Sequence, residues 1–407
     1  MEMSWRPNFV EKLIEAHETN DFSYNSGIAV EFDVMIETER MKSSFLKVLK
    51  KYPKLCYSYK DNKPIFDLDH LFTLKTGSSL NDFTEKLSIN EGKGVRLVID
   101  AELHRIKFYV HHSLVDGICH SYLLKELLNF YVGNEIEISL NREGLQSGNY
   151  SRIQFFRRFL DPNFRRVLLN LSKRYDCFTL VQPNSISRQK YMSKNLVIEK
   201  KQLENLKQYS RKLKVSNFNL ILEVACQALV KTEPDIRKDI VIACPINLRG
   251  VIKNNAYFGN MVGLTRFSIS LKDVKEQRSL YSIKKELKNL ISKKYFSLMF
   301  EVLNYISLFL SKKKLKKIFS KKTMNSTDIN STFMASYMKV DSGTFPPQMK
   351  LKNASLLSSL FKSPGMGFVI VEMEDYMFIT LTFCEDEIPV QSIDTLTENL
   401  SVELNKC

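Results

Sequence analysis

His111-His112-Ser113-Leu114-Val115-Asp116-Gly117 is the most informative segment of this chain. The 407 residues include only six histidines, and four of these lie between His104 and His120. Apolar residues alternate over His104–His112, which predicts a strand that ends here, and the apolar run over Gly117–Val132 predicts the helix that follows. A histidine at such a junction is suited to acid–base chemistry because its ordinary pKa lies near neutrality.

The same alternation places the two adjacent histidines on opposite faces of the predicted strand. His112 shares a face with the apolar residues of the strand, among them Phe108, whereas His111 points to the other face with Lys107 and Tyr109. We therefore expect the two imidazoles to have different surroundings and different roles.

Three other interpretations of this cluster are open. A metal site formed by His111, His112 and His120 is disfavoured because no carboxylate or cysteine lies at a familiar zinc spacing. Cys119 as a nucleophile would need a histidine and a third group arranged around it, and nothing in the pattern indicates them. A structural pair of buried histidines is the third.

The composition excludes several classes of protein. With 44% hydrophobic residues and only 14 glycines and 11 prolines, the chain is neither disordered nor collagen-like. Its seven cysteines are scattered without a C-x-x-C pair, which excludes a disulfide scaffold and argues against a zinc ribbon. The first residues lack a signal-like pattern, and no apolar run reaches the roughly 18 residues of a membrane span. We expect a reduced, soluble, cytoplasmic protein.

Strands and helices alternate in both halves of the sequence, and the polar segment Gly133–Tyr150 has the composition of a linker. This alternation predicts an α/β or α+β sandwich with a first lobe at 1–150 and a second at 151–407. The patterns predict strands at 27–36, 54–59, 94–103, 104–112, 191–198, 239–246, 259–269, 367–373 and 376–383, and helices at 8–17, 37–51, 117–132, 201–213 and 216–228.

The spacing His-His-x-x-x-Asp-Gly at 111–117 resembles the hallmark of the chloramphenicol-acetyltransferase-like superfamily. Its members include condensation domains of nonribosomal peptide synthetases, alcohol acetyltransferases, plant-type acyltransferases and polyketide-associated acyltransferases. Pro245–Gly250 followed by Tyr257–Asn260 is similar to the N-x-R and Y-F-G-N segments of the second lobe in these families. Ser336–Lys339 resembles their S-x-x-G strand, with Lys339 in place of the glycine, and the hairpin ending at Phe383 resembles their last strands.

Two departures from the family pattern bear on which branch of the superfamily the sequence resembles. Cys119 stands where these families often have serine, and Ser363–Gly367 occupies the region where the plant-type branch has D-F-G-W-G. Within the 407 residues we find no segment that resembles a carrier or adenylation module, and we expect none to be attached. The resemblance therefore favours a standalone acyltransferase.

The resemblance implies two similar lobes with a tunnel between them, in which an acyl group passes from a thioester to an alcohol or amine. His112 would be the general base. Asp116 would form a structural ion pair with Arg249 and hold the loop, with orientation of His112 by Asp116 as the alternative. Gly117 would keep the tunnel open and let a backbone N–H approach the oxyanion, although it could equally be a simple helix-start glycine. Asn260 would help to hold the second lobe without a chemical role.

The excess of 60 basic over 45 acidic residues favours anionic partners, although it is equally typical of a lysine-rich composition. The implied co-substrate is acyl-CoA or a phosphopantetheinyl thioester on an acidic acyl carrier protein, with no permanently bound cofactor and no metal. A solvated helix face is the alternative for the lysines that could meet the donor, which are Lys200, Lys201, Lys207, Lys212 and Lys214.

The apolar segment Ser297–Leu310 and the lysines after it predict either a peripheral membrane contact through 297–322 or a core helix with a solvated end. No zinc finger, RNP-like run or helix-turn-helix pattern accompanies the lysines, so nucleic acid is not an expected partner. The alternatives to a standalone acyltransferase are a condensation-domain-like, amide-forming enzyme on carrier-bound substrates and a non-catalytic relative used as a binding protein.

Overall fold

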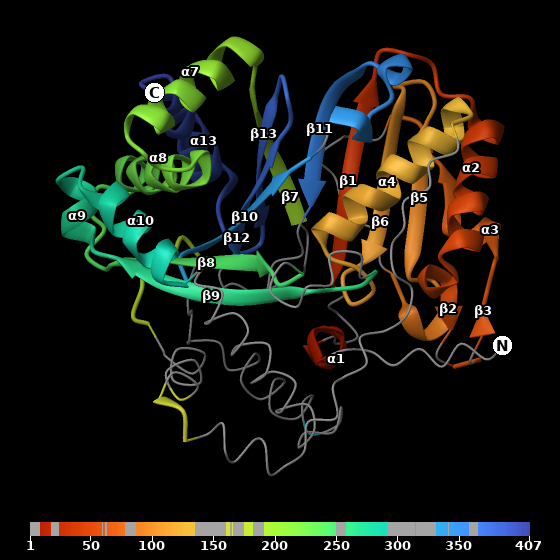
Figure 1. Cartoon of the computed structure of the whole chain (residues 1–407), viewed down its shortest axis with the longest axis horizontal. Coiled ribbons are helices and arrows are strands. Elements are labelled where there is room, and N and C mark those ends of the chain that lie inside the picture. The colour runs from red at the N-terminus through yellow and green to blue at the C-terminus, as the bar shows by residue number, and fades with distance from the viewer. Residues whose placement is uncertain are drawn as a thin grey trace.

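The chain forms a mixed α/β molecule with two sheets side by side and helices on their outer faces (Figure 1). This arrangement confirms the expected fold class. The computed structural model describes residues 9–17, 24–58, 60–61, 63–77, 87–134, 160–162, 165, 175–181, 191–249, 258–290, 314, 331–340, 342–357 and 365–407.

The first sheet has the strand order β11-β1-β6-β5-β4 and is antiparallel except for the pair β4 and β5. Helices α2 and α4 cover its outer face, and α1 lies below the sheets in Figure 1. The elements of this lobe are α1 (Phe9–His17), β1 (Asn25–Phe32), α2 (Thr38–Lys51), the 3-10 turn Pro53–Cys56, β2 (Tyr57–Ser58), β3 (Lys63–Pro64), α3 (Leu68–Leu71), β4 (Phe72–Leu74), β5 (Val95–Asp100), β6 (Arg105–His111), α4 (Gly117–Val132) and β11 (Leu351–Leu357).

Alternation along β1 and β6 explains how this sheet is covered. Ile28 pairs with Phe108 and Val30 with Ile106, so the apolar residues of both strands share one face and pack under the helices. The opposite face carries Ala29 and Tyr109, and Tyr191 of the second lobe packs against this cluster. Burial of one face against helices is the main stabilising contribution here.

The second sheet has the order β7-β13-β12-β10-β8-β9, with β10 parallel to both β8 and β12. Ser216 caps α8 by accepting a hydrogen bond from the backbone N–H of Asn219 at 3.1 Å, as the sequence predicts. The elements of this lobe are β7 (Tyr191–Ile198), α7 (Lys200–Lys212), α8 (Asn217–Thr232), β8 (Ile240–Asn247), β9 (Val262–Ile269), α9 (Leu271–Lys275), α10 (Ser279–Leu290), β10 (Phe333–Lys339), β12 (Met366–Glu372), β13 (Met377–Cys384) and α13 (Val390–Leu404).

One strand crosses between the halves of the sequence. β11 pairs with β1 in the first sheet although it follows most of the second lobe along the chain. It also contacts the second sheet, because the hydroxyl of Ser355 lies 3.3 Å from that of Ser193 and Leu356 donates its backbone N–H to Thr380 at 3.2 Å. The division at residue 150 lies outside the described residues and stays a prediction, but residue number alone does not separate the two sheets.

Several predicted strands differ from the structure in extent, and two of them differ most. The strand expected at 27–36 is β1 and ends at Phe32, because the next backbone N–H, of Asp33, bonds to Lys350 instead. The strand expected at 54–59 is mostly a 3-10 turn that begins at Pro53, whose fixed φ favours a turn start.

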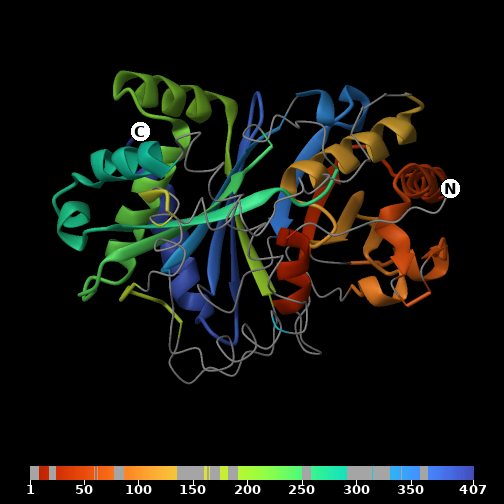
Figure 2. The same ribbon diagram turned by 60° about the horizontal axis from the view of Figure 1, so that its bottom comes forward.

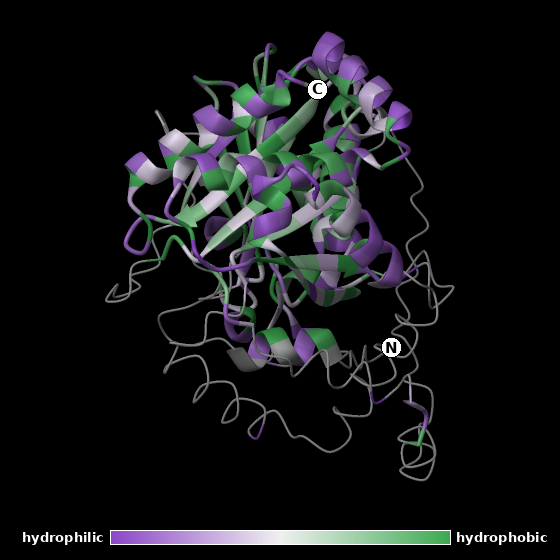
Figure 3. Ribbon diagram, turned by 90° about the vertical axis from the view of Figure 1, so that its left-hand side faces the viewer, coloured by the Kyte–Doolittle hydropathy of each residue, from purple (hydrophilic) through white to green (hydrophobic). Residues whose placement is uncertain are grey.

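Hydrophobic residues gather in the sheets and on the inner faces of the helices, and hydrophilic residues on the outer faces (Figure 3). No single helix in the described part of the chain is long and apolar enough to cross a membrane; only α7 and α8 taken together, bent by 100°, reach that length and composition. Except for Lys314, the segment 297–322 lies outside the described residues.

Candidate active site

The loop 111–117 connects the last residue of β6 to the first residue of α4. The backbone N–H of His111 donates to Gly94 at 2.8 Å, and that of His112 donates to Tyr24 at 2.6 Å, so the strand ladder continues to its end. Asp116 then caps α4 by accepting a hydrogen bond from the N–H of Cys119 at 3.0 Å. The loop is therefore held by backbone hydrogen bonds at its start and by the side-chain cap of Asp116 at its end.

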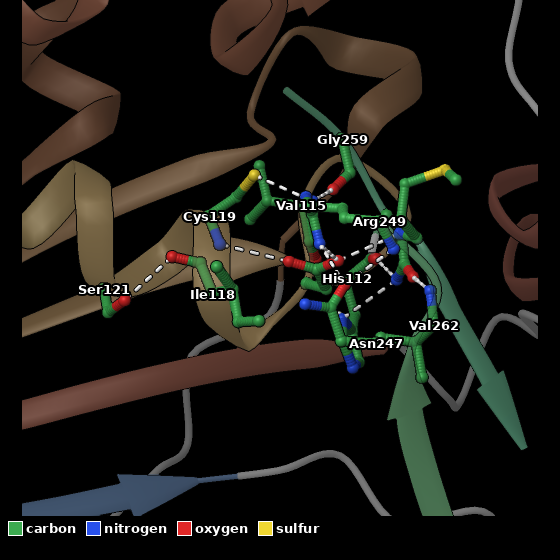
Figure 4. A network of polar contacts seen from close by, with 12 residues as sticks. His112, Val115, Ile118, Cys119, Ser121, Asn247, Arg249, Gly259 and Val262 are labelled. Carbon is green, nitrogen blue, oxygen red and sulfur yellow. Dashed lines mark hydrogen bonds and ion pairs between the residues drawn. The ribbon is translucent and has the colours of Figure 1, made fainter. Parts of the chain in front are cut away.

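The imidazole of His112 has a defined tautomer. Its Nδ1 lies 2.9 Å from the carbonyl oxygen of Val115, which can only accept, so Nδ1 carries the hydrogen and Nε2 carries the lone pair (Figure 4). Burial lowers the pKa of His112 below its ordinary value, and the contact with Val115 and the charge of Asp116 oppose this shift only in part. The ring is a neutral base near pH 7.

His111 has different surroundings and stays on the face of Lys107 and Tyr109, as the alternation predicts. It is fully buried, and Ser113 donates to its Nδ1 both from the hydroxyl, at 2.7 Å, and from the backbone N–H, at 3.3 Å. His112 lies one residue beyond β6, so the turn and not the strand period sets the direction of its ring. The contacts of His111 hold the loop.

Asp116 and Arg249 form the expected ion pair, which joins the two lobes. Arg249 Nη1 lies 2.5 Å from Asp116 Oδ2, and the two side chains are only 3% and 1% exposed. Asp116 Oδ2 also accepts the N–H of Met261 at 2.9 Å, and Arg249 Nη2 donates to Gly259 at 2.7 Å. Burial alone would lower the pKa of Arg249, but Asp116 and Cys119 raise it above its ordinary value. None of these contacts reaches the ring of His112.

Asn260 lies against His112, a placement that the sequence did not indicate. Its Nδ2 donates to the backbone oxygen of His112 at 2.7 Å and lies 3.3 Å from the ring Nδ1. The N–H of Val262 donates to Asn260 Oδ1 at 3.2 Å, which fixes the orientation of the amide. The Y-F-G-N segment is the sequence signal for this contact. It could have indicated that Asn260 lies near His112 only through the resemblance to the known families.

The other residues of the cluster have structural surroundings. Burial, with the charge of Asp116, raises the pKa of Cys119 to about 12, and its sulfur accepts from Arg249 Nη2 at 3.1 Å, which argues against a nucleophilic thiolate. Burial lowers the pKa of His120 to about 3, and its Nδ1 lies 3.1 Å from the hydroxyl of Ser26. Among the described residues, no three of His, Cys, Asp and Glu could hold a metal ion.

Gly117 is exposed at the start of α4. Among the described residues, an added Cβ would have only the sulfur of Met338, at 4.0 Å, within contact distance, so none of them fills the space beside Gly117. Two lysines of the expected donor surface are paired instead: Lys200 lies 2.9 Å from Asp375, and Lys207 lies 3.8 Å from Glu372. These pairs favour the solvated-face interpretation of α7.

No protein-family model and no curated protein sequence matches the chain. Its structure is similar to solved structures of a cyclization-docking bidomain from a nonribosomal peptide synthetase of Sorangium cellulosum, with a TM-score of 0.67, 12% identity, and 99% of this chain and 84% of that chain covered. It is also similar to a trichothecene 15-O-acetyltransferase from Fusarium sporotrichioides, with a TM-score of 0.66, 10% identity, and 98% and 93% covered. The condensation domain of the monacolin K polyketide synthase matches at 0.65 and 12% identity, over 97% and 94%. The chain therefore has the condensation-domain and acetyltransferase fold.

Proposed function

We propose that this chain is an acyltransferase that moves an acyl group from a thioester to an alcohol or amine, with His112 as general base. The observation that carries the proposal is the tautomer of His112. Its Nδ1–H is engaged by Val115, the imidazole is neutral, and no hydrogen bond from a described residue involves Nε2. An imidazole held in this way can accept a proton at Nε2.

The reaction balances without an enzyme-bound intermediate. Nε2 of His112 takes the proton of the acceptor hydroxyl or amine as its oxygen or nitrogen attacks the thioester carbonyl. The carbon–sulfur bond then breaks, and the imidazolium returns the proton to the leaving thiolate. The products are an ester or amide and a free thiol, and His112 ends in its starting state.

The start of α4 supplies a place for the negative charge of the tetrahedral intermediate. The first N–H groups of a helix have no intrahelical partner, and Asp116 accepts only that of Cys119. Gly117 has no side chain to cover its own backbone N–H. The N-terminus of a helix also favours an anion. We place the developing oxyanion there.

The donor in this proposal is acyl-CoA or a phosphopantetheinyl thioester on an acyl carrier protein. Solved structures with the same fold include both an acetyltransferase and condensation domains, so the proposal covers ester and amide products. A standalone enzyme that uses acyl-CoA is the first form to test. An amide-forming enzyme on carrier-bound substrates is the alternative, and a carrier-bound donor distinguishes the two.

The test is release of free thiol from a panel of acyl-CoA esters and acyl-phosphopantetheinyl carriers, with alcohol and amine acceptors. We expect acceptor-dependent thiol release that is lost in His112→Ala. The matched control is His70→Ala, because His70 is an exposed histidine on α3 with a side chain 61% exposed. Tight thioester binding without thiol release from any donor would contradict the proposal and support a binding protein.

A further inference from the structure

A buried carboxylate outside the His112 loop joins the two lobes beneath it. Glu11 of α1 is fully buried, and its Oε1 accepts hydrogen bonds from Lys54 Nζ at 2.9 Å and from the backbone N–H of Asn260 at 3.3 Å. Lys54 belongs to the first lobe and Asn260 to the second. Figure 2 brings α1 forward, close to the line where the two lobes meet.

We propose that Glu11 is a positioning residue, which holds Asn260 in place against His112. The inference rests on the proposed function of His112. Glu11 acts through one backbone hydrogen bond: it fixes the amide of Asn260, whose side chain in turn donates to the carbonyl oxygen of His112 at 2.7 Å. α1 is in this way part of the active-site framework.

The positive charge of Lys54 compensates the buried negative charge of Glu11. Its side chain is 11% exposed, and its ammonium group also lies 5.7 Å from the centre of the Phe258 ring. An unpaired carboxylate at this depth would be strongly destabilising, so the lysine is needed whenever position 11 is charged. The carboxylate of Glu11 therefore has two separate roles: it pairs with Lys54, and it accepts the backbone N–H of Asn260.

The segment 258–261 takes its position from the first lobe. Phe258 stacks on Tyr52 with ring centres 4.6 Å apart, and the N–H of Met261 donates to Asp116. Between these two anchors, Glu11 is the group that binds the N–H of Asn260. Without it, the backbone N–H of Asn260 loses this hydrogen bond from the first lobe, and we expect the contact between Asn260 and His112 to loosen and water to reach the Nδ1 side of His112.

This loss has a spectroscopic consequence that a purely structural role does not share. Burial lowers the pKa of His112, so a looser, wetter site raises that pKa toward the ordinary value of about 6.5. A base with a higher pKa is protonated over a wider range of pH. The acid limb of the rate profile would then move to higher pH by the same amount.

The experiment separates the two roles of Glu11 in a Lys54→Met background, so that neither replacement of Glu11 leaves the Lys54 ammonium without its carboxylate. In that background Glu11→Gln keeps an oxygen that accepts from Asn260, whereas Glu11→Met has a similar length and no acceptor. The readouts are the His112 pKa, from the NMR titration of histidine labelled with carbon-13 and assigned with His112→Ala, and kcat and KM for thiol release. Glu31→Gln is the matched control, since Glu31 is a buried carboxylate paired with Arg105 and Lys352 away from this segment.

We expect Glu11→Gln to retain the wild-type His112 pKa and kcat. Glu11→Met should raise that pKa and lower kcat by up to about 100-fold, with KM little changed because Glu11 touches no substrate. The same pKa in both variants, or an equal shift in Glu31→Gln, would overturn the inference. If wild-type protein releases no thiol, the proposed function fails, but the NMR titration still tests the positioning of His112 by Glu11.

Discussion

The loop 111–117 and the segment 258–261 lie against each other, yet they obtain their shapes in different ways. The loop is largely organised by its own residues: His112 bonds to Val115, His111 to Ser113, and Asp116 caps the helix that begins next to it. The segment 258–261 is held mainly by groups distant in sequence, including Glu11, Asp116 and Tyr52.

This difference separates chemistry from assembly. Contacts within a few residues form whenever the loop adopts its turn, so they can set the tautomer of His112 independently of the second lobe. Contacts between residues more than 100 positions apart form only after both lobes have folded, because closing so long a loop of chain costs entropy. Variants of the loop at His112 should therefore mainly alter turnover. The contacts between the lobes at Asp116, Arg249 and the segment 258–261 form a joint, and variants of this joint should alter stability as well.

The largest expected effect comes from the loop. His112→Ala should lower the rate of transfer by about 10²–10⁴-fold, because the general base is lost. Thermal unfolding should change little, since the ring is only half-buried. His111→Ala, which removes a fully buried ring, should reverse the pattern with a lower melting temperature and a milder loss of rate. Full activity in folded His112→Ala protein would remove the mechanism.

The second effect concerns the joint. Asp116→Ala and Arg249→Ala each strand a buried charge and should each cost roughly 3–5 kcal/mol in the free energy of unfolding. The double variant should lose much less than the sum, because both single variants break one contact. Urea unfolding of the four proteins measures the coupling. Strictly additive losses, or Asp116→Asn protein of normal stability with turnover reduced by orders of magnitude, would instead favour direct orientation of His112 by Asp116.

The pH dependence sharpens the comparison, because it reports directly on the surroundings of the His112 ring. A general base works in its neutral form, and burial lowers the pKa of His112, so kcat/KM should remain at its plateau below pH 6.5 and fall only as pH drops through the folded pKa. Stability has the same sign: the unfolded chain binds the proton first, at about pH 6.5, so the native state loses stability between that pH and the folded pKa. An acid limb centred above pH 6.5 would contradict the lowered pKa.

The smallest expected effect lies at the point where loop and joint meet. Cys119→Ser places a hydroxyl where Arg249 now donates to sulfur. The cost of burying the hydroxyl and the gain from a hydrogen bond to a charged group are of similar size, so stability should change by less than about 1.5 kcal/mol. Denaturant unfolding and thiol release should both stay close to wild type. A large loss of turnover at unchanged stability would show that the thiol itself is needed.

Much of the fold was predictable because its elements depend on local patterns. The strand at 191–198 and the helix at 117–132 match β7 and α4, and the Ser216 cap follows from the preference of serine for that position. The pairing of Asp116 with Arg249 was predictable from the resemblance alone. No local pattern distinguishes a buried carboxylate such as Glu11 from an exposed one.

The sequence by itself determined many of the helices and strands and the chemistry available at the His-His-x-x-x-Asp-Gly loop, since periodicity, capping and ordinary side-chain pKa are properties of neighbouring residues. Only the tertiary structure decided that β11 joins the first sheet, that Asn260 lies against His112 and that Glu11 binds its amide. These are contacts across 148 to 330 residues of chain, whose formation depends on how whole faces of sheets and helices are buried together. The position of a buried polar group is set by the partners that remain to satisfy it once the cores have formed.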